Sequence, residues 1–97
     1  MILEETFQKN RMKIVIEIEI DEIGAKLKFA RELAGISLNA AGNLGAMTGS
    51  NLSRIENEET KRVPLPTLIR AARAVNLDLN SLLGRWADLL IPLEQKE

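Results

Sequence analysis

The chain alternates strictly between isoleucine and other residues from Lys13 to Ile20. The isoleucines stand at Ile14, Ile16, Ile18 and Ile20, and the positions between them are mostly charged. Period-two alternation of β-branched residues is typical of a strand with one apolar face. One strand can neither pair its own backbone groups nor cover its own apolar face. This segment therefore requires a partner strand and a surface that covers its isoleucines. This requirement constrains the fold more than any other sequence feature.

Two partners for this strand are consistent with the sequence. Residues 1–12 are mixed in character, and no second strong strand pattern occurs. We therefore expect the strand to pair antiparallel with its copy in another subunit, across a two-fold axis. The four isoleucines would then form the dimer contact and cover Phe29, Leu33 or the segment Leu89–Ile91. The alternative is pairing within the chain, against Leu89–Leu93.

From Asp21 onward the apolar spacing changes to three and four residues, which predicts helices. We expect helices at 22–34, 38–44, 49–57, about 64–75 and about 79–90, the last one ended by Pro92. Asp21, Ser37 and Thr48 are residue types that cap the N-terminus of a helix, and Asn76 suits a left-handed C-terminal cap. The pattern predicts a mostly α protein with one N-terminal strand.

Three segments follow from this pattern in a chain of 97 residues, a length that suits one domain with a short extra element. They are an N-terminal dimerisation arm at 1–22 with its strand at 13–20, a helical domain at 23–83, and a C-terminal helical extension or tail at 84–97. The arm has three basic and six acidic residues, net −3, whereas residues 23–62 have six basic and four acidic, net +2. Positive charge is therefore concentrated in the first part of the helical domain, although the whole chain has a net charge of −1.

Several residue types on which enzymes and metal sites depend are missing. The chain has no Cys, no His and no Tyr, which excludes disulfides and thiolate metal sites and removes the usual general base. We therefore expect no enzymatic activity, no metal and no cofactor. The longest strongly apolar runs, Ile14–Ile16 and Leu89–Ile91, cannot span a bilayer, and Glu4 and Glu5 interrupt any signal-peptide pattern. We expect a cytoplasmic protein that does not contact a membrane.

Short motifs between residues 23 and 83 follow the order of the expected helices. They are Ile23-Gly24 with Leu27 and Arg31, then Gly35-Ile36-Ser37, then Thr48 with Leu52-Ser53-Arg54-Ile55-Glu56, and finally the spacing of Leu68, Ala72, Val75, Leu77, Leu79 and Leu82. Through these residues the chain resembles the lambda-repressor-like, or xenobiotic-response-element, helix-turn-helix family. The resemblance implies a five-helix DNA-binding domain whose second helix crosses the DNA backbone and whose third helix lies in the major groove.

The resemblance also implies roles for individual residues. Gly49, Ser50 and Arg54 would read base edges, and Ser37, Asn51, Lys61 and Arg62 would lie near phosphates. Arg31 and Glu56 would form a partly buried ion pair that joins the first and third helices. No residue is assigned a catalytic or metal-binding role.

The chain departs from the family pattern at three informative positions. Leu38 stands where the family usually has a Gln that touches DNA, and Ala46 stands where the turn usually has Gly. Gly49 offers no side chain to a base. Arg54 is then the only long side chain placed for bidentate contact with guanine. We expect sparse base readout, with DNA shape contributing more than usual.

Each candidate residue also has a simpler structural interpretation. Arg54 on an exposed helix face would be a solvated charge, Lys61 and Arg62 would belong to a polar loop, and Ser37 would only cap its helix. Gly42 and Gly45 would serve close packing, and Trp86 would be a core or interface residue. Two functions are therefore consistent with these residues.

The function we expect is a dimeric, sequence-selective, DNA-binding regulator of transcription, with its recognition helix at about 49–57. Its partners would be double-stranded DNA and a second copy of the chain, with a further protein partner also open. The alternative is a protein-interaction module that retains the helix-turn-helix fold without binding DNA. Leu38, Gly49 and the negative net charge favour this alternative, because DNA-binding domains are usually basic.

Overall fold

The computed structural model describes residues 2–9 and 12–94, without the side chains of 7–9, 12–14, 93 and 94. The strands are β1 (Ile2–Lys9), β2 (Met12–Glu19) and β3 (Arg62–Pro64). The helices are α1 (Ile23–Leu33), α2 (Leu38–Leu44), α3 (Gly49–Glu56), α4 (Leu65–Ala74), α5 (Leu79–Leu83), a 3-10 turn at Gly84–Trp86 and α6 (Ala87–Glu94). The protein is mostly helical with a small three-stranded sheet, which confirms the mostly α class that the sequence predicts.

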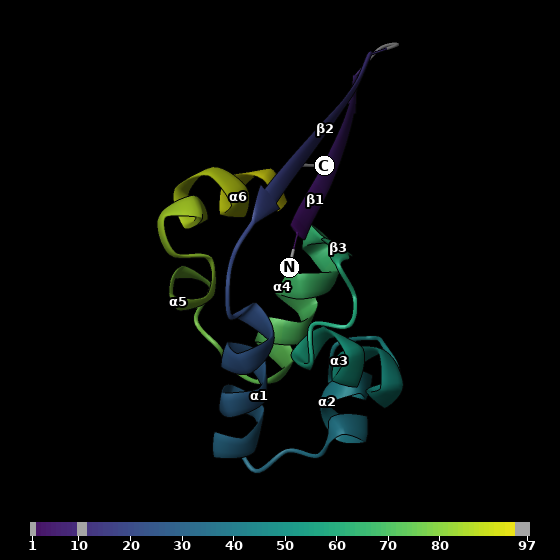
Figure 1. Cartoon of the computed structure of the whole chain (residues 1–97), viewed down its shortest axis with the longest axis vertical. Coiled ribbons are helices and arrows are strands. Elements are labelled where there is room, and N and C mark those ends of the chain that lie inside the picture. The colour runs from purple at the N-terminus through teal and green to yellow at the C-terminus, as the bar shows by residue number, and fades with distance from the viewer. Residues whose placement is uncertain (1, 10–11, 95–97) are drawn as a thin grey trace.

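The helices form a body from which the β1–β2 hairpin projects at one end (Figure 1). Helix α4 runs through the middle of this body, with α1, α5 and α6 toward one side and α2 and α3 toward the other. The central place of α4 fits its burial, because Leu65, Leu68 and Ile69 are all fully buried. The projecting hairpin gives the molecule an elongated outline of 44 × 25 × 23 Å.

The predicted strand is present, and its partner within the chain is a strand that the sequence did not predict. Pairing with a second copy, along the other edge of the strand, stays a prediction. β2 pairs antiparallel with β1 in the same chain, in a register that runs from Ile2 opposite Glu19 to Lys9 opposite Met12. The segment Leu89–Leu93 belongs to helix α6 instead. The prediction that residues 1–12 contain no strand was therefore wrong. Glu5 interrupts the apolar alternation of β1, so this segment becomes a strand through pairing with β2 rather than through its own pattern.

The sheet has the order β2-β1-β3, and β3 runs parallel to β1. Leu3 lies opposite Ile18 on one side and Val63 on the other, and all three side chains are buried. This row fixes the base of the hairpin to the helical core. Ile16 and Ile20 pack against the same core and are half-buried.

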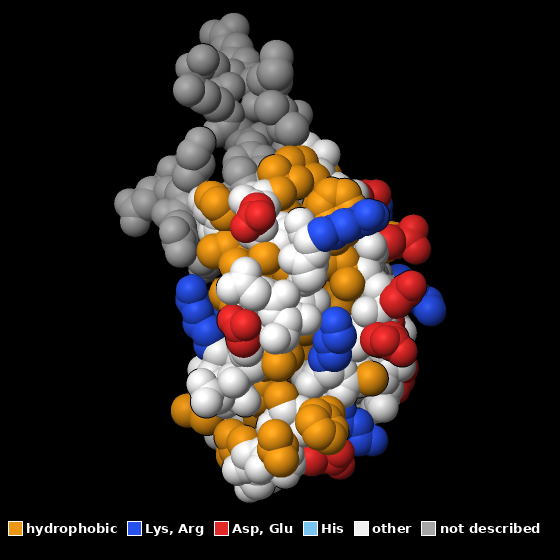
Figure 2. Space-filling view, turned by 90° about the vertical axis from the view of Figure 1, so that its left-hand side faces the viewer, with side chains coloured by type: hydrophobic (Ala, Val, Ile, Leu, Met, Phe, Trp, Pro, Cys, Tyr) orange, Lys and Arg blue, Asp and Glu red, His pale blue; other side chains and the backbone are white. Residues whose placement is uncertain are grey.

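We expected the isoleucine face to cover Phe29, Leu33 or the segment Leu89–Ile91, and the two α1 residues are not covered. Phe29 is 68% exposed and Leu33 is 77% exposed. Because the hairpin projects from the opposite end of the body, it leaves these two residues open. Figure 2 shows hydrophobic side chains on the face that contains α1 and α6. The side chain of Ile14, which we also assigned to the dimer contact, lies outside the described residues.

Two helix boundaries differ from the prediction because of the backbone conformation. Glu22, rather than Asp21, precedes α1, and it has φ 64° and no capping hydrogen bond from its side chain. The expected fifth helix is broken at Gly84, which has φ 57°. A left-handed residue cannot continue a right-handed helix, so the chain turns there and α6 begins as a separate helix. Pro92 lies inside α6 and does not end it.

Candidate nucleic-acid interface

Helices α2 and α3 begin at the two predicted capping residues. The Ser37 hydroxyl accepts a hydrogen bond from the Ala40 amide at 3.1 Å, and the Thr48 hydroxyl accepts one from the Asn51 amide at 3.0 Å. Each hydroxyl satisfies an amide that the first helical turn leaves without a partner. Both helices are short, so these caps help to define where each one starts.

The turn between the two helices contains a strained residue. Ala46 has φ 58°, a left-handed conformation that favours glycine and costs other residues about 1 kcal/mol. At this position the helix-turn-helix family that the sequence resembles usually has Gly. The turn tolerates Ala because its other contacts hold it, including a hydrogen bond from the Met47 amide to the Gly42 carbonyl at 2.8 Å.

Two glycines allow α2, the turn and α3 to approach closely. A Cβ atom on Gly42 would lie 2.9 Å from both the Gly49 nitrogen and the Met47 carbonyl oxygen. A Cβ atom on Gly49 would collide with the side chain of Asn39 and lie 3.2 Å from the Asn39 nitrogen. Close packing therefore accounts for Gly42. It also gives Gly49, an expected base-reading residue, a structural role against α2.

Arg31 of α1 and Glu56 at the end of α3 form a bidentate ion pair. The Arg31 Nε donates to Glu56 Oε2 at 2.7 Å, and Nη2 donates to Oε1 at 3.1 Å. The third donor, Nη1, reaches the Ile36 carbonyl at 2.9 Å, in the segment before α2. The hydrogen bond to Glu56 is the main reason that the pKa of Arg31 is raised. One guanidinium thus connects α1, the entry to α2 and the end of α3.

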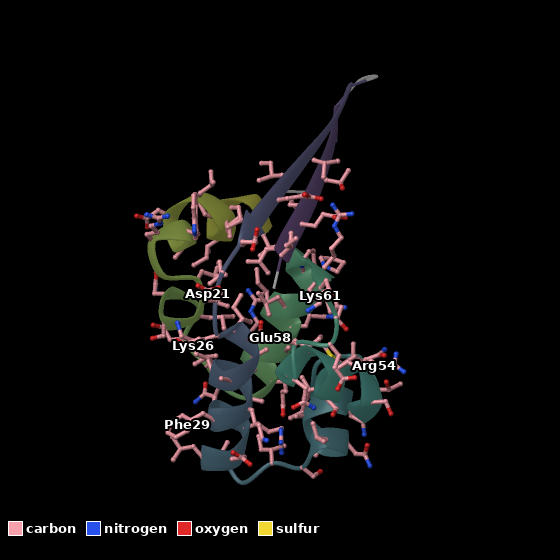
Figure 3. All side chains as sticks on the ribbon, in the orientation of Figure 1. Asp21, Lys26, Phe29, Arg54, Glu58 and Lys61 are labelled. Atoms are coloured by element: carbon pink, nitrogen blue, oxygen red, sulfur yellow. The ribbon has the colours of Figure 1, made fainter. Side chains whose placement is uncertain are left out.

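The outer face of α3 is exposed and carries Ser50, Asn51 and Arg54. Arg54 makes no hydrogen bond or ion pair with its side chain to any other described residue. Figure 3 shows it pointing away from the body, on the same side of the molecule as Lys61. The Lys61 side chain is exposed on the loop after α3, while its backbone carbonyl accepts a hydrogen bond from the Ile2 amide at 2.8 Å. The structure thus brings three of the expected contact residues to one face of α3.

Two shallow hollows lie on either side of Arg54. The first is lined by the start of α2 and by α3, with Ser37, Leu38, Asn39, Ser50 and Arg54 among its lining residues. The second is lined by the turn, α3, β3 and α4, with Asn51, Arg54, Arg62, Thr67 and Arg70 among them. Arg54 therefore stands on a ridge between two depressions.

The second hollow contains three arginines, but two of them already have partners. Arg70 donates from Nε to the Gly45 carbonyl at 3.1 Å and from Nη2 to the Thr67 hydroxyl at 3.3 Å. Its first hydrogen bond supports the turn before α3. Arg70 was not among the predicted residues, although its place opposite the apolar stripe of α4 marks it as a surface residue.

Arg62 forms ion pairs with two carboxylates of the hairpin. It donates to Glu17 of β2, and its Nε lies 3.4 Å from Glu4 of β1. Glu4 and Glu17 stand directly opposite each other across the two strands, where like charges repel. Arg62 offsets this repulsion and links the hairpin to the segment after α3. The sequence did not reveal this contact because β1 was not predicted.

Comparison of the chain with family models, with curated proteins and with solved structures gives no match. No helix in the described part of the chain is long and apolar enough to cross a membrane. Among residues 2–9 and 12–94, no group of three or more acidic side chains is arranged to hold a metal ion.

Proposed function

We propose that this protein is a dimeric, sequence-selective, DNA-binding regulator of transcription of the lambda-repressor-like helix-turn-helix type, with α3 in the major groove. The observation that carries the proposal is Arg54, which is exposed on the outer face of α3 and has no hydrogen-bond or ion-pair partner among the described residues. An exposed guanidinium of this kind is suited to a bidentate contact with the O6 and N7 atoms of guanine. In this arrangement Ser50 and Asn51 make short-range contacts beside it.

Hydrogen bonds hold both ends of α3 in place. Arg31 holds the C-terminal end of the helix through Glu56, and Thr48 caps its N-terminal end. A reading helix must keep its side chains in register with the bases, so rigid support favours recognition. The half-buried Leu38 on the rim of the first hollow offers an apolar contact for thymine methyl groups.

Phosphate contacts complete the proposed interface. The Ser37 hydroxyl and the Lys61 ammonium group are exposed at its margins. Arg62 would have to exchange its hairpin carboxylates for phosphates. Because exposed ion pairs contribute only about 0–1 kcal/mol, this exchange has a small cost. Phosphate contacts release counterions, so affinity should fall as salt rises.

The test is retention of pooled genomic DNA fragments by the purified protein at about 50 and 200 mM salt, followed by sequencing. We expect a two-fold symmetric motif whose retention weakens at the higher salt. Arg54→Ala should weaken binding by roughly 1–3 kcal/mol and relax one base position. Arg85→Ala is the matched control, because Arg85 lies over the Trp86 ring between α5 and α6, away from α3. Equal binding by the Arg54 and Arg85 variants would refute the assignment of α3.

A second candidate function is a protein-interaction module without DNA binding. The specific observation in its favour is the exposed pair Phe29 and Leu33, which lie one turn apart on α1. Figure 3 shows Phe29 pointing outward from that helix. Failure to retain DNA at either salt concentration would favour this candidate over the first.

A further inference from the structure

Strand β2 has an open edge. It is the end strand in the order β2-β1-β3, and its eight residues pair with β1 without a bulge or a proline. In an antiparallel ladder, every second residue directs its amide and carbonyl groups away from the existing partner. No described residue from outside the hairpin forms a backbone hydrogen bond with β2. A regular edge of this kind is a template for another strand.

The opposite edge of the sheet cannot serve in the same way. β3 is only three residues long, ends in Pro64 and continues directly into α4. Proline lacks an amide donor, and short edge strands resist pairing. The sheet can therefore grow only at β2. Growth by an identical edge stops at two copies, because pairing uses the same surface on both.

We propose that two copies of this chain pair antiparallel along β2, with the two-fold axis at Ile16. The result is a continuous six-stranded sheet built from the three-stranded sheets of the two copies, rather than a two-stranded ribbon. This inference rests on the dimeric part of the proposed function and names the surface that the second copy occupies.

The charges on β2 select this register. Lys13, Glu17 and Glu19 share one face of the strand by alternation, and Glu17 is already paired with Arg62. Glu19 is exposed and has no hydrogen bond or ion pair to another described residue. An axis at Ile16 places Glu19 of each copy opposite position 13 of the other, where the sequence has a lysine.

Neighbouring registers are less favourable. An axis at residue 17 would place the two Glu17 carboxylates directly opposite each other, where they repel. An axis at Val15 would pair Lys13 with Glu17, which already has Arg62, and would leave Glu19 unpaired. Sliding one strand by a single residue, which moves the axis to a point between two residues, would place the apolar face of one copy beside the charged face of the other. The chosen register also continues the isoleucine face, with residue 14 opposite residue 18.

The experiment is sedimentation velocity without DNA over a concentration series. The wild type should dimerise. Lys13→Glu alone and Glu19→Lys alone should each raise the dimer dissociation constant by roughly ten-fold, because two attractive cross-strand pairs become repulsive. An equal mixture of the two variants should form heterodimers at near wild-type concentration, since each residue then meets an opposite charge. The double variant should also recover.

Lys28→Glu is the matched control, because Lys28 is exposed on α1 and the charge change is the same. Thermal melting of each variant separates lost dimerisation from lost folding. Single variants that dimerise like the Lys28 control, or a mixture that stays monomeric, would refute the register. A wild type that is monomeric at every concentration would refute both the interface and the dimeric part of the function. DNA binding that is sensitive to Arg54→Ala would still leave the role of α3 standing.

Discussion

Arg31 is the residue on which the support of α3 depends most. Glu56 is the only charged side chain that is fully buried among the described residues, with 3% of its side chain exposed. Arg31→Ala should lower the free energy of unfolding by about 3 kcal/mol, because it leaves that carboxylate buried without a partner. Denaturant unfolding measures the change. Replacing both residues, as Arg31→Met with Glu56→Gln, should cost clearly less than the single change. An unaltered unfolding midpoint for Arg31→Ala would contradict a structural role.

The pH dependence of this contribution has a definite sign. The pKa of Arg31 is raised in the folded protein, chiefly by the hydrogen bond to Glu56. A cation with a raised pKa contributes stability that is fully present below its unfolded pKa and is lost only as pH rises through the folded value. Because the unfolded pKa of a guanidinium is already far above neutrality, the contribution of Arg31 should not change across the neutral range.

The contacts of an individual residue could be predicted from the sequence where its partner is close to it in the chain. Ser37 and Thr48 cap helices through hydrogen bonds to residues three positions later, so sequence distance alone predicts them. Arg31 and Glu56 are far apart in sequence and were paired through the family resemblance. The partners of Arg62 could not be found either way, because Glu4 and Glu17 become neighbours only when the hairpin forms.

At the scale of elements, a helix or strand could be predicted where its own sequence pattern is clear. Helices α2 and α3 have clear caps and apolar spacing, and their positions follow from the sequence. β1 has a weak pattern of its own and is a strand because β2 and β3 pair with it. The break at Gly84 was missed because glycine is tolerated within helices, and nothing local shows that this one adopts φ 57°.

The attachment of the hairpin to the body gives an element-scale prediction. Arg62→Gln should accelerate hydrogen exchange of the β1 amides that face β3, because it removes the charge that offsets Glu4 and Glu17. The free energy of unfolding should fall by less than about 1 kcal/mol, since the Arg62 side chain is 60% exposed and its ion pairs are screened by solvent. Lys61→Gln removes the neighbouring charge, which forms no ion pair with another described residue, and serves as the control. Equal exchange rates in the two variants would refute this role for Arg62.

At the scale of the whole molecule, the two proposed surfaces lie on different parts of the fold. The hairpin projects from one end of the body, whereas α3 lies on one side of it near the other end (Figure 1). In the proposed function, α3 offers the bases only one long side chain, Arg54, so DNA binding would gain from two copies of α3 on one DNA molecule. Joining two modules makes the second contact intramolecular and raises overall affinity by roughly 10²–10⁴-fold when geometry permits both contacts.

This separation predicts that a charge change on the hairpin alters DNA binding from a distance. Lys13→Glu should lower DNA affinity at protein concentrations below its dimer dissociation constant, although residue 13 is in the hairpin rather than in α3. An equal mixture with Glu19→Lys should restore the affinity, because the heterodimer again presents two copies of α3. Arg54→Ala should show the opposite pattern, with dimerisation intact and DNA affinity reduced in every mixture. Fluorescence anisotropy on a selected DNA site measures both effects, and Lys28→Glu controls for the added negative charge. If Lys13→Glu bound DNA as tightly as Lys28→Glu across the concentration series, the hairpin would have no part in DNA binding and each chain would have to act alone.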